Sequence, residues 1–329
     1  MSIVKDNILF HNVEELEKTS MGYKLYRYPR EVRRHLNERA RFMAQYVCGC
    51  ELRFVTESER IHINLTAQGS GLILAIVFKG DYVHSVQQLE ADKNTLLEIV
   101  DRPIPESAHN AFYKDNNFDK NVWRVHLHNC LFTIHSINTM DYDIRPPYPD
   151  EMPKKTMLAY GSSITHGAVA VTHTNSYAEE AARILGVDIL NKGVGGSCQF
   201  EPEVADFFAK DKTWNFAWIE GAVNSTLFEP EEFKKRFDYF IDTLHETGRP
   251  VFMTTILPNA SLVDKTSEHH ERCIQFDEII RGKKDKGIVI EGNRIITDLR
   301  FLSLDTIHPS NEGHTRMGIN LAQILKEYL

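Results

Sequence analysis

The sequence predicts two domains of different fold class, an all-β sandwich or jelly roll followed by an α/β domain with a parallel sheet. Three observations carry this prediction. Apolar side chains alternate with polar ones before position 145, four prolines fall within residues 146–153, and strands alternate with amphipathic helices after position 155. A chain of 329 residues is long enough for about two domains. We therefore expect a sandwich at 1–145, a stiff proline-rich linker at 146–154 and the α/β domain at 155–329.

Period-two patterning runs through the first 145 residues. Ile61, Ile63 and Leu65 alternate with polar residues, as expected for a strand with one buried face. The apolar run at 71–78 ends in a Lys-Gly-Asp turn at 79–81, which predicts a hairpin. Strands separated by turn residues in this way favour an antiparallel sandwich or jelly roll. Short helical pieces are expected only at 13–18 and 31–36.

After position 155 the pattern changes to strands that alternate with helices. Ser176 and Glu179 have the spacing of a capping box, and Gly186 ends the helix that they open. This alternation predicts a parallel sheet covered by helices on both faces, with reactive groups at the carboxyl ends of the strands. Strands are predicted at 156–160, 188–190, 216–219, 251–256 and 287–290, and helices at 176–185, 233–244, 266–281 and 317–325.

The composition is that of an acidic chain without membrane or secretion signals. Asp and Glu number 46 against 38 Lys and Arg, and the resulting net charge of -8 disfavours a nucleic-acid partner. No apolar run approaches the roughly 20 residues of a membrane span, and the first residues lack the pattern of a signal peptide. Five scattered cysteines are too few for a disulfide scaffold. We expect no nucleic-acid or membrane partner and a location in the reducing cytoplasm.

Four loops carry residues suited to chemistry, and each lies where a predicted strand ends or the last helix begins. They are YGSSITHG at 160–167, NKGVGGS at 191–197, GAVNS at 221–225 and SLDTIHPSNEGH at 303–314. Each loop alone has an ordinary structural explanation: a turn, an anion-binding backbone nest, an amide that ties down its own loop, or a cap before a helix. Their joint occurrence favours a catalytic site.

Together the loops supply the groups that acyl transfer needs: a nucleophile, a base, an acid that orients the base, and oxyanion donors. Ser163 follows a buried strand in a glycine-flanked turn, so its hydroxyl can project into a crevice. His308 is the candidate base, and Asp305 lies three residues before it, within reach of the same imidazole. Gly196 offers an unhindered backbone N–H, and Asn224 offers a side-chain amide.

These loops resemble the sequence blocks of the SGNH or GDSL hydrolase family over residues 155–329. The serine block is Gly-Ser-Ser-Ile-Thr-His-Gly at 161–167, and the last block, Asp-Thr-Ile-His-Pro at 305–309, matches fully. The second block keeps its conserved positions at Asn191, Gly193 and Gly196.

The resemblance implies a flavodoxin-like, three-layer α/β/α domain and a serine hydrolase mechanism. It assigns Ser163 as the nucleophile, with Asp305 and His308 completing a triad. It also places the N–H groups of Ser163 and Gly196 and the amide of Asn224 in the oxyanion hole. This chemistry needs no metal and no organic cofactor.

The chain departs from the family pattern inside these blocks. Ser162 stands where the family has Asp, which leaves the triad intact because its acid comes from the last block. The third block keeps Asn224, but Ser225 replaces the Asp that follows it. The stretch at 22–27 is similar to a Gly-x-Asp-Leu-Tyr sequence ahead of some of these hydrolases, with Lys24 in place of Asp.

Several histidines outside the blocks have less specific explanations. His166 and His173 are weak candidates for binding substrate, although exposed loop positions are the ordinary expectation. His126 and His128 share a strand face, and the His269-His270 pair lies on a predicted helix. Solvent exposure is favoured over metal binding for both pairs, so no metal site is expected.

The resemblance favours a serine esterase that removes short acyl groups, mainly acetyl, from small molecules or oligosaccharides, because a jelly roll joined to an SGNH domain occurs among carbohydrate esterases. A mean hydropathy of -0.35 and the lack of a large apolar lid agree with short acyl groups. A lipase, an acyl-thioesterase or an acyltransferase would use the same triad and stay open as alternatives. So does a carbohydrate-binding protein with a weakened hydrolase domain. The sandwich would bind sugar, cover an edge of the hydrolase domain or form a homo-oligomer interface.

Overall fold

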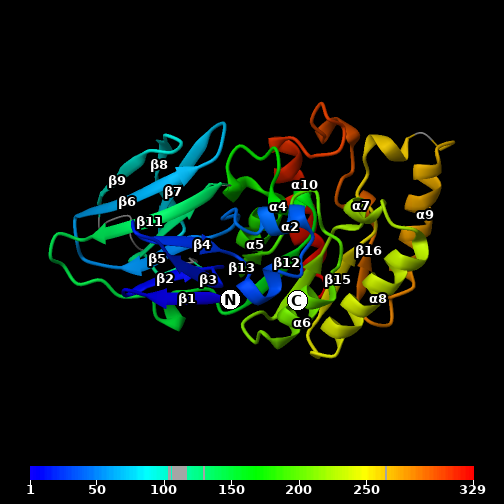
Figure 1. Cartoon of the computed structure of the whole chain (residues 1–329), viewed down its shortest axis with the longest axis horizontal. Coiled ribbons are helices and arrows are strands. Elements are labelled where there is room, and N and C mark those ends of the chain that lie inside the picture. Colours follow the sequence, from blue (N-terminus) through cyan, green and yellow to red (C-terminus); the bar gives the residue numbers. More distant parts are fainter. Residues whose placement is uncertain (103–104, 106–116, 129, 264) are drawn as a thin grey trace. The chain divides into compact units, whose positions relative to one another are not determined.

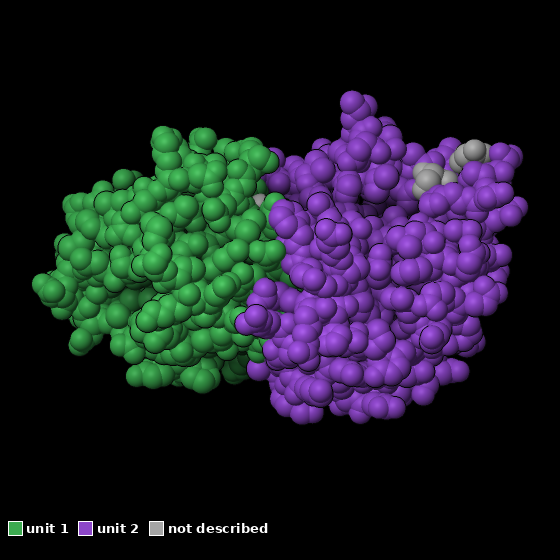
Figure 2. Space-filling model, in the orientation of Figure 1, with its two compact units in different colours: residues 1–29, 44–154 green, residues 30–43, 155–329 purple. Residues whose placement is uncertain are grey.

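The chain divides into two compact units in the computed structural model, which describes residues 1–102, 105, 117–128, 130–263 and 265–329 (Figure 1). The first unit comprises Met1–Pro29 and Ala44–Lys154, and the second comprises Arg30–Met43 and Lys155–Leu329 (Figure 2). The long part of the second unit thus begins directly after the prolines. The second unit also contains residues 30–43, which the sequence pattern assigned to the sandwich.

The first unit is a β-sandwich of two antiparallel sheets, as the alternating pattern predicts. In the described residues the strand orders are β1-β2-β5-β10-β7-β8 and β3-β4-β11-β6-β9. The first sheet contains β1 (Ser2–Lys5), β2 (Ile8–His11), β5 (Glu51–Val55), β10 (Val122–Leu127), β7 (Ile73–Lys79) and β8 (Tyr82–Leu89). The second sheet contains β3 (Glu15–Lys18), β4 (Tyr23–Tyr26), β11 (Leu131–Asn138), β6 (Arg60–Gln68) and β9 (Asn94–Val100).

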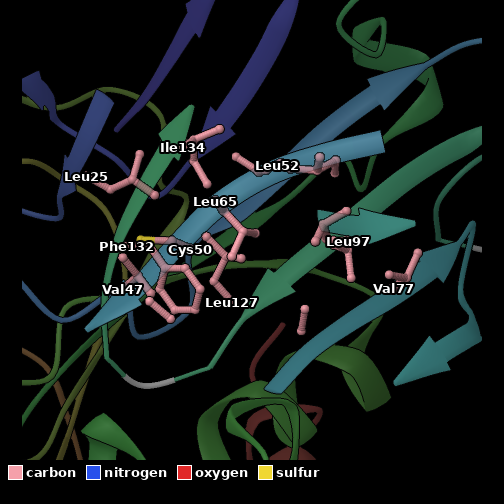
Figure 3. Packing of buried hydrophobic residues seen from close by; sticks show 14 of the residues in the cluster. Leu25, Val47, Cys50, Leu52, Leu65, Val77, Leu97, Leu127, Phe132 and Ile134 are labelled. Carbon is pink, nitrogen blue, oxygen red and sulfur yellow. The ribbon is translucent and has the colours of Figure 1, made fainter. Parts of the chain in front are cut away.

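The core of the sandwich is built from the alternating apolar positions of both sheets (Figure 3). On β6, Ile61, Ile63 and Leu65 are fully buried, whereas the residues between them are partly exposed. Leu52 and Phe54 of β5 belong to the same cluster. Successive side chains of a strand point to opposite faces, so the period of two places one face of each strand in the core.

Two local predictions in this half are wrong. Residues 15–18, expected to be helical, form β3, because an antiparallel ladder with β4 satisfies a backbone that is too short for a stable helix. His126 was expected on a solvated sheet face but is 3% exposed. Its burial is possible because Nε2 pairs with the buried carboxylate of Glu51 at 3.0 Å.

Residues 30–43 form two short helices, α1 (Arg30–Arg33) and α2 (Glu38–Met43). The first overlaps the helical piece expected at 31–36, and the second is not predicted. Asn37, between them, donates hydrogen bonds to the Ser197 carbonyl at 3.2 Å and the Glu201 carboxylate at 2.8 Å. These partners lie 160 and 164 positions away in the sequence, so local patterning cannot reveal them.

The proline-rich stretch contains a turn of 3-10 helix where irregular chain is expected. This turn, η1 (Pro149–Glu151), begins with a proline, whose fixed φ suits a first helical position. Glu151 accepts hydrogen bonds from both terminal nitrogens of Arg145 at 2.7 Å. The bidentate pair closes the stretch into a defined turn.

The second unit is built on a parallel sheet with the order β13-β12-β14-β15-β16 in the described residues. Counted along the chain this is 2-1-3-4-5, the flavodoxin-like order, and it confirms the predicted fold class. The order reverses between β12 and β14, which makes the carboxyl ends of these strands the switch point where ligands bind. The strands are β12 (Thr156–Tyr160), β13 (Asp188–Asn191), β14 (Phe216–Ile219), β15 (Val251–Thr254) and β16 (Ile288–Ile290).

Helices cover both faces of this sheet and complete three layers (Figure 1). On one face two helices pack together over Met157 and Ala159 of β12. On the other face Tyr160 stacks on Phe240 inside a cluster of aromatic rings. The first face carries α5 (Tyr177–Leu185) and α10 (Asn311–Leu325); the second carries α6 (Pro202–Lys210) and α8 (Pro230–His245), with α9 (Glu268–Arg281) packed on α8.

Candidate active site

Ser163 is the first residue of a short helix at the carboxyl end of β12. Ser162 caps this helix, α4 (Ser163–His166), by accepting a hydrogen bond from the N–H of Ile164 at 3.1 Å. A serine is a favoured N-cap because its hydroxyl oxygen satisfies an otherwise unpaired helical N–H. The cap therefore fixes the backbone that presents Ser163 at the switch point of the sheet.

The turn into this helix requires a glycine at position 161. A Cβ there would lie 2.3 Å from Thr165 Oγ1 and 2.6 Å from the Glu220 carbonyl oxygen. Gly161 thus lets the nucleophile turn approach the end of β14 closely.

Three side chains distant along the chain meet in one hydrogen-bonded line. Ser163 Oγ lies 2.7 Å from His308 Nε2, and His308 Nδ1 lies 2.7 Å from Asp305 Oδ2. With the carboxylate accepting from Nδ1–H, Nε2 is free to accept the proton of the serine hydroxyl. The geometry is that of a nucleophile, a base and the group that orients the base.

Asp305 is oriented by the loop that carries it. Its Oδ1 accepts hydrogen bonds from the N–H groups of Ile307 at 3.0 Å and His308 at 2.9 Å, and from Ser303 Oγ at 2.8 Å. Partial burial raises the pKa of this carboxyl, but the hydrogen bonds from His308 and Ile307 outweigh it and hold the pKa well below its ordinary value. Asp305 is therefore ionised throughout the range in which an imidazole titrates.

The loop after β13 runs alongside Ser163. Asn191 ties it to α4 by donating to a helical carbonyl at 2.8 Å and accepting from the N–H of Gly193 at 3.0 Å. A Cβ at Gly195 would lie 3.9 Å from Ser163 Cβ. Gly196 has a φ of +71°, and its N–H donates to no other described residue. The loop thus brings an unused backbone donor close to the nucleophile.

Asn224 is tied to the same loop from the end of β14. It lies in α7 (Ala222–Ser225), and its Oδ1 accepts a hydrogen bond from the N–H of Cys198 at 3.3 Å. Its Nδ2 donates to no other described residue. Ser225 Oγ donates to the Cys198 carbonyl at 3.1 Å, so this serine holds the two loops together where the family pattern has Asp.

Helix α2 adds two side chains beside the glycine loop that the sequence analysis missed. Arg39 Nε donates to the Gly195 carbonyl at 3.4 Å and would lie 3.9 Å from a Cβ at Gly196. Met43 Cε would lie 3.1 Å from a Cβ at Gly195. No motif marks either residue, because both come from a segment that precedes the hydrolase blocks by more than a hundred positions.

The two histidines named as weak substrate-binding candidates are buried, each at 1% exposure. His166 Nδ1 lies 3.1 Å from the Gly193 carbonyl, and His173 Nε2 lies 3.1 Å from the Glu179 carboxylate. Exposed loop positions are therefore the wrong expectation for both, because each ring pairs with a group inside the unit. Because Glu179 contacts His173, it does not form the predicted capping box with Ser176. Ser176 is the N-cap of α5 without the predicted side-chain hydrogen bond.

A third histidine, His314 of α10, was not singled out from the sequence. Its Nδ1 accepts a hydrogen bond from the N–H of Tyr177 at 3.3 Å, so Nε2 carries the proton and donates to the Ala168 carbonyl at 2.9 Å. Burial lowers the pKa of His314 to about 4. The ring is neutral near pH 7 and ties the loop after α4 to α10.

A buried carboxylate lies against the nucleophile turn and was also missed. Glu220 directly follows β14 and is 3% exposed. It accepts hydrogen bonds from the N–H of Ser162 at 3.0 Å, from Ser162 Oγ at 2.8 Å and from Thr165 Oγ1 at 2.9 Å. Burial raises the pKa of Glu220, and these hydrogen bonds lower it only in part. Its signal in the sequence was an acidic residue at the end of the apolar strand Phe-Ala-Trp-Ile.

No group of three or more His, Cys, Asp or Glu side chains in the described ranges is placed to hold a metal ion. Within the same ranges, no helix combines the length and apolar character needed to cross a bilayer.

The fold and the hydrogen-bonded line at its switch point are those of an SGNH-type hydrolase. A sequence model of the GDSL-like lipase/acylhydrolase family matches residues 154–326, more than half of the chain. The chain belongs to this family and is a carboxylic ester hydrolase by class, which confirms the resemblance seen in its loops. No curated protein sequence matches the chain.

Solved structures share the two-domain fold at low sequence identity. The salicylyl-acyltransferase SsfX3 of a tetracycline biosynthetic pathway is 14% identical with a TM-score of 0.81, over 100% of this chain and 97% of that one. A GDSL-like lipase from Bacteroides ovatus, described as putative, is 17% identical with a TM-score of 0.70, over 99% and 98%. A family two carbohydrate esterase from Cellvibrio japonicus is 13% identical with a TM-score of 0.60, over 99% and 96%. At these identities the likeness establishes the fold alone.

Proposed function

We propose that the protein is a serine esterase that hydrolyses short acyl esters, mainly acetyl esters of carbohydrate, through Ser163, His308 and Asp305. The observation that carries the proposal is the pair of 2.7 Å contacts that join the serine hydroxyl, the imidazole and the carboxylate. A base must lie within hydrogen-bond reach of the proton that it removes, and this one does.

The chemistry follows from this line. His308 Nε2 takes the proton of Ser163 as Oγ attacks the ester carbonyl, and Asp305 stabilises the imidazolium that forms. The N–H groups of Ser163 and Gly196 and the amide of Asn224 hold the oxyanion. His308 then gives the proton to the leaving alcohol, which leaves an acyl-enzyme. Water attacks this ester with His308 again as base, and His308 then returns that proton to Ser163 Oγ as the carboxylic acid leaves.

The substrate class is supported by the fold and by the space beside the serine. A carbohydrate esterase of family two from Clostridium thermocellum with this fold has been solved in complex with cellohexaose, at 14% identity and a TM-score of 0.55 over 84% of this chain and 91% of that one. In this chain Gly195 of the glycine loop has both Met43 and Ser163 as near neighbours, which restricts the room for an acyl chain there. A small acyl group on a larger polar alcohol fits this arrangement.

The first test is hydrolysis of nitrophenyl acetate by the full chain and by Ser163→Ala. The variant should lose activity down to the residual level left by oxyanion stabilisation and binding. Ser58→Ala, at another buried serine in the first unit, is the matched control and should keep the wild-type rate. Full activity in Ser163→Ala would refute the assignment of the nucleophile.

Two further measurements separate the alternatives. A fluorophosphonate should label Ser163 in the wild type; lack of labelling would favour a carbohydrate-binding protein with an inactive hydrolase domain. Acetate release from a panel of acetylated oligosaccharides should exceed hydrolysis of decanoyl esters. A preference for decanoyl esters would instead support a lipase or thioesterase.

Acyl transfer is the second candidate, and the exposed apolar side chains of the loop around Asp305 favour it. Leu304 is 99% exposed and Ile307 is 39% exposed, directly beside Asp305 and His308. An apolar acceptor packed on these side chains would exclude water from the acyl-enzyme. Addition of an apolar alcohol during ester turnover distinguishes the two reactions, because a transferase forms the new ester in preference to free acid.

A further inference from the structure

Among the described residues, the hydrogen-bond donors to the Glu220 carboxylate all come from the turn and helix that carry Ser163. Both donors of Ser162 and the hydroxyl of Thr165 belong to the turn and helix that carry Ser163. Glu220 therefore holds the residue before Ser163 and a residue one half-turn after it. In the described part of the chain no lysine or arginine pairs with this carboxylate, so these donors alone offset its buried charge.

A relay of hydroxyl groups also points toward Glu220. Trp218 Nε1 donates to Tyr177 OH at 2.7 Å. Because the Thr165 hydroxyl proton goes to Glu220, the Tyr177 hydroxyl is the donor in its 2.7 Å contact with Thr165 Oγ1. Thr165 in turn donates to Glu220 at 2.9 Å. Every donor in this relay is directed at the carboxylate, which sets a single orientation for each hydroxyl.

The same turn is capped by the side chain that Glu220 holds. Ser162 Oγ accepts from the N–H of Ile164 at 3.1 Å and donates to Glu220 at 2.8 Å. The hydroxyl is thus fixed as acceptor on one side and donor on the other. Loss of the carboxylate would release Ser162 to rotate and would loosen the first turn of α4, where Ser163 lies.

A buried carboxylate is a costly way to achieve packing alone. A buried charge destabilises the folded state unless it is compensated, and an apolar group of similar volume often serves stability as well or better. The retention of a charge at this place, in contact with the nucleophile turn, points to a use in the reaction.

We propose that Glu220 is the positioning residue of the nucleophile. From the neighbouring strand it supplies the carboxylate that the Gly-Ser-Ser turn lacks at Ser162, and it holds Ser163 Oγ in line with His308 Nε2. The inference rests on the proposed role of Ser163 and adds a residue that does not touch the substrate.

The first test is Glu220→Gln, which keeps the shape and removes the charge. Misplacement of a reacting group by a fraction of an ångström lowers turnover while substrate binding is kept, so kcat should fall about ten- to a hundredfold with KM unchanged. The rate constant for fluorophosphonate labelling of Ser163 should fall by the same factor. The amide removes a buried charge and weakens charge-assisted hydrogen bonds, so Tm should change little.

The labelling measurement separates positioning from folding. If Glu220 serves only the fold, Glu220→Gln should lower Tm and the fraction of molecules that label, while the labelled fraction keeps the wild-type rate constant. That result would overturn the proposal. Asp277→Asn is the matched control, because Asp277 is a half-buried carboxyl whose pKa burial raises to about 6 and which lies outside the catalytic loops.

The second test transfers the carboxylate from position 220 to position 162, the two sides of the Ser162–Glu220 hydrogen bond. Ser162→Asp in the wild type places two carboxylates within hydrogen-bond distance of each other and should lower kcat further than any neutral change there. Ser162→Asp in the Glu220→Gln background restores one carboxylate, which can accept from the Ile164 N–H and from the new amide. The double variant should regain at least tenfold in kcat over Glu220→Gln.

The proposal thus predicts that Ser162→Asp lowers kcat in the wild type and raises kcat in the Glu220→Gln background. An equal loss from Ser162→Asp in both backgrounds would overturn it, as would a Glu220→Gln enzyme within twofold of the wild type. If the double variant does not fold, kcat and the labelling rate constant of Glu220→Gln still decide whether the proposal holds. Failure of the proposed function gives a different result, since Ser163→Ala would then keep activity or the wild type would fail to label.

Discussion

Two carboxylates lie near the Ser163–His308 pair in contrasting surroundings: Asp305 contacts His308 directly, and Glu220 contacts Ser162 and Thr165 on either side of Ser163. Asp305 lies in an open loop with its side chain 46% exposed, and it reaches the imidazole. Glu220 is 3% exposed and reaches the turn that carries the serine. Hydrogen bonds hold the pKa of Asp305 below its ordinary value, whereas burial raises the pKa of Glu220 above it.

In the proposed mechanism this difference divides the orientation of the base and of the nucleophile between two kinds of surroundings. The base must take up and release a proton, and its partner is set by backbone N–H groups of a solvent-accessible loop. The nucleophile must keep one position, and its turn is set by a buried network. Substitutions in the open loop should therefore change the chemistry more than the stability, whereas substitutions that remove a side chain of the buried network, unlike the shape-preserving Glu220→Gln, should change both.

The largest effect is expected from Asp305→Asn. An amide at this position favours the wrong imidazole tautomer, so kcat should fall on the order of 10³- to 10⁴-fold. Steady-state hydrolysis of nitrophenyl acetate measures this. Asp298→Asn is the control, since Asp298 is a neighbouring half-buried carboxyl whose pKa is lowered to about 2 by hydrogen bonds from Arg300. Equal losses in the two variants would show that Asp305 acts through the loop and not through His308.

Asn224→Ala tests whether the Asn224 amide stabilises the oxyanion and, like the open loop, affects turnover more than stability. Loss of one oxyanion donor should lower kcat on the order of 10²- to 10³-fold with Tm little changed. Asn320→Ala removes an amide of α10 that donates to the Ile295 carbonyl, and it should leave kcat unchanged. A rise in KM or a fall in Tm with kcat unchanged in Asn224→Ala would assign this amide to loop structure.

His314→Gln tests the buried part of the unit through the pH dependence of folding stability. Since burial lowers the pKa of His314 to about 4, the unfolded chain binds this proton more readily than the folded one. The stability due to the neutral ring is complete above about pH 6.5 and is lost as the pH falls toward 4, a change of roughly 3 kcal/mol. Denaturant unfolding of His314→Gln should therefore show a weaker loss of stability over this range than the wild type. An unchanged slope would contradict the buried, neutral assignment.

The smallest effect is expected from Met43→Ala, at the edge of the site. Removal of this side chain enlarges the space beside Gly195, so kcat/KM for butyryl over acetyl esters should rise by about tenfold or less. Met21→Ala, at an exposed methionine of the first unit, should leave this ratio unchanged. An unchanged ratio in Met43→Ala as well would remove α2 from the acyl-binding region.

Much of the fold was predictable because the spacing of apolar residues along a strand or helix is a local property of the sequence. The alternation of Ile61, Ile63 and Leu65 predicted β6, and the predicted strands of the second unit agree with β12 to β16 within a few residues. The errors fall where tertiary contacts override local pattern. Residues 15–18 became a strand through pairing with β4, and Glu179 left its capping box to pair with His173.

The candidate site divides in the same way. Ser163, Asp305 and His308 were found from the sequence because a short motif surrounds each of them. Glu220 and Met43 were not, since nothing within a few positions marks them. Their relation to Ser163 is created by neighbouring strands and by a helix that precedes the site by more than a hundred residues.

The sequence by itself determined the strands of the parallel sheet to within a few residues, the family and the three residues of the hydrogen-bonded line, because hydrophobic period and short motifs are properties of neighbouring residues. Only the tertiary structure decided which carboxylate contacts which part of the site, that residues 30–43 belong to the second unit, and that three loop or helix histidines are buried. These depend on burial and on contacts between distant segments, which local sequence does not encode.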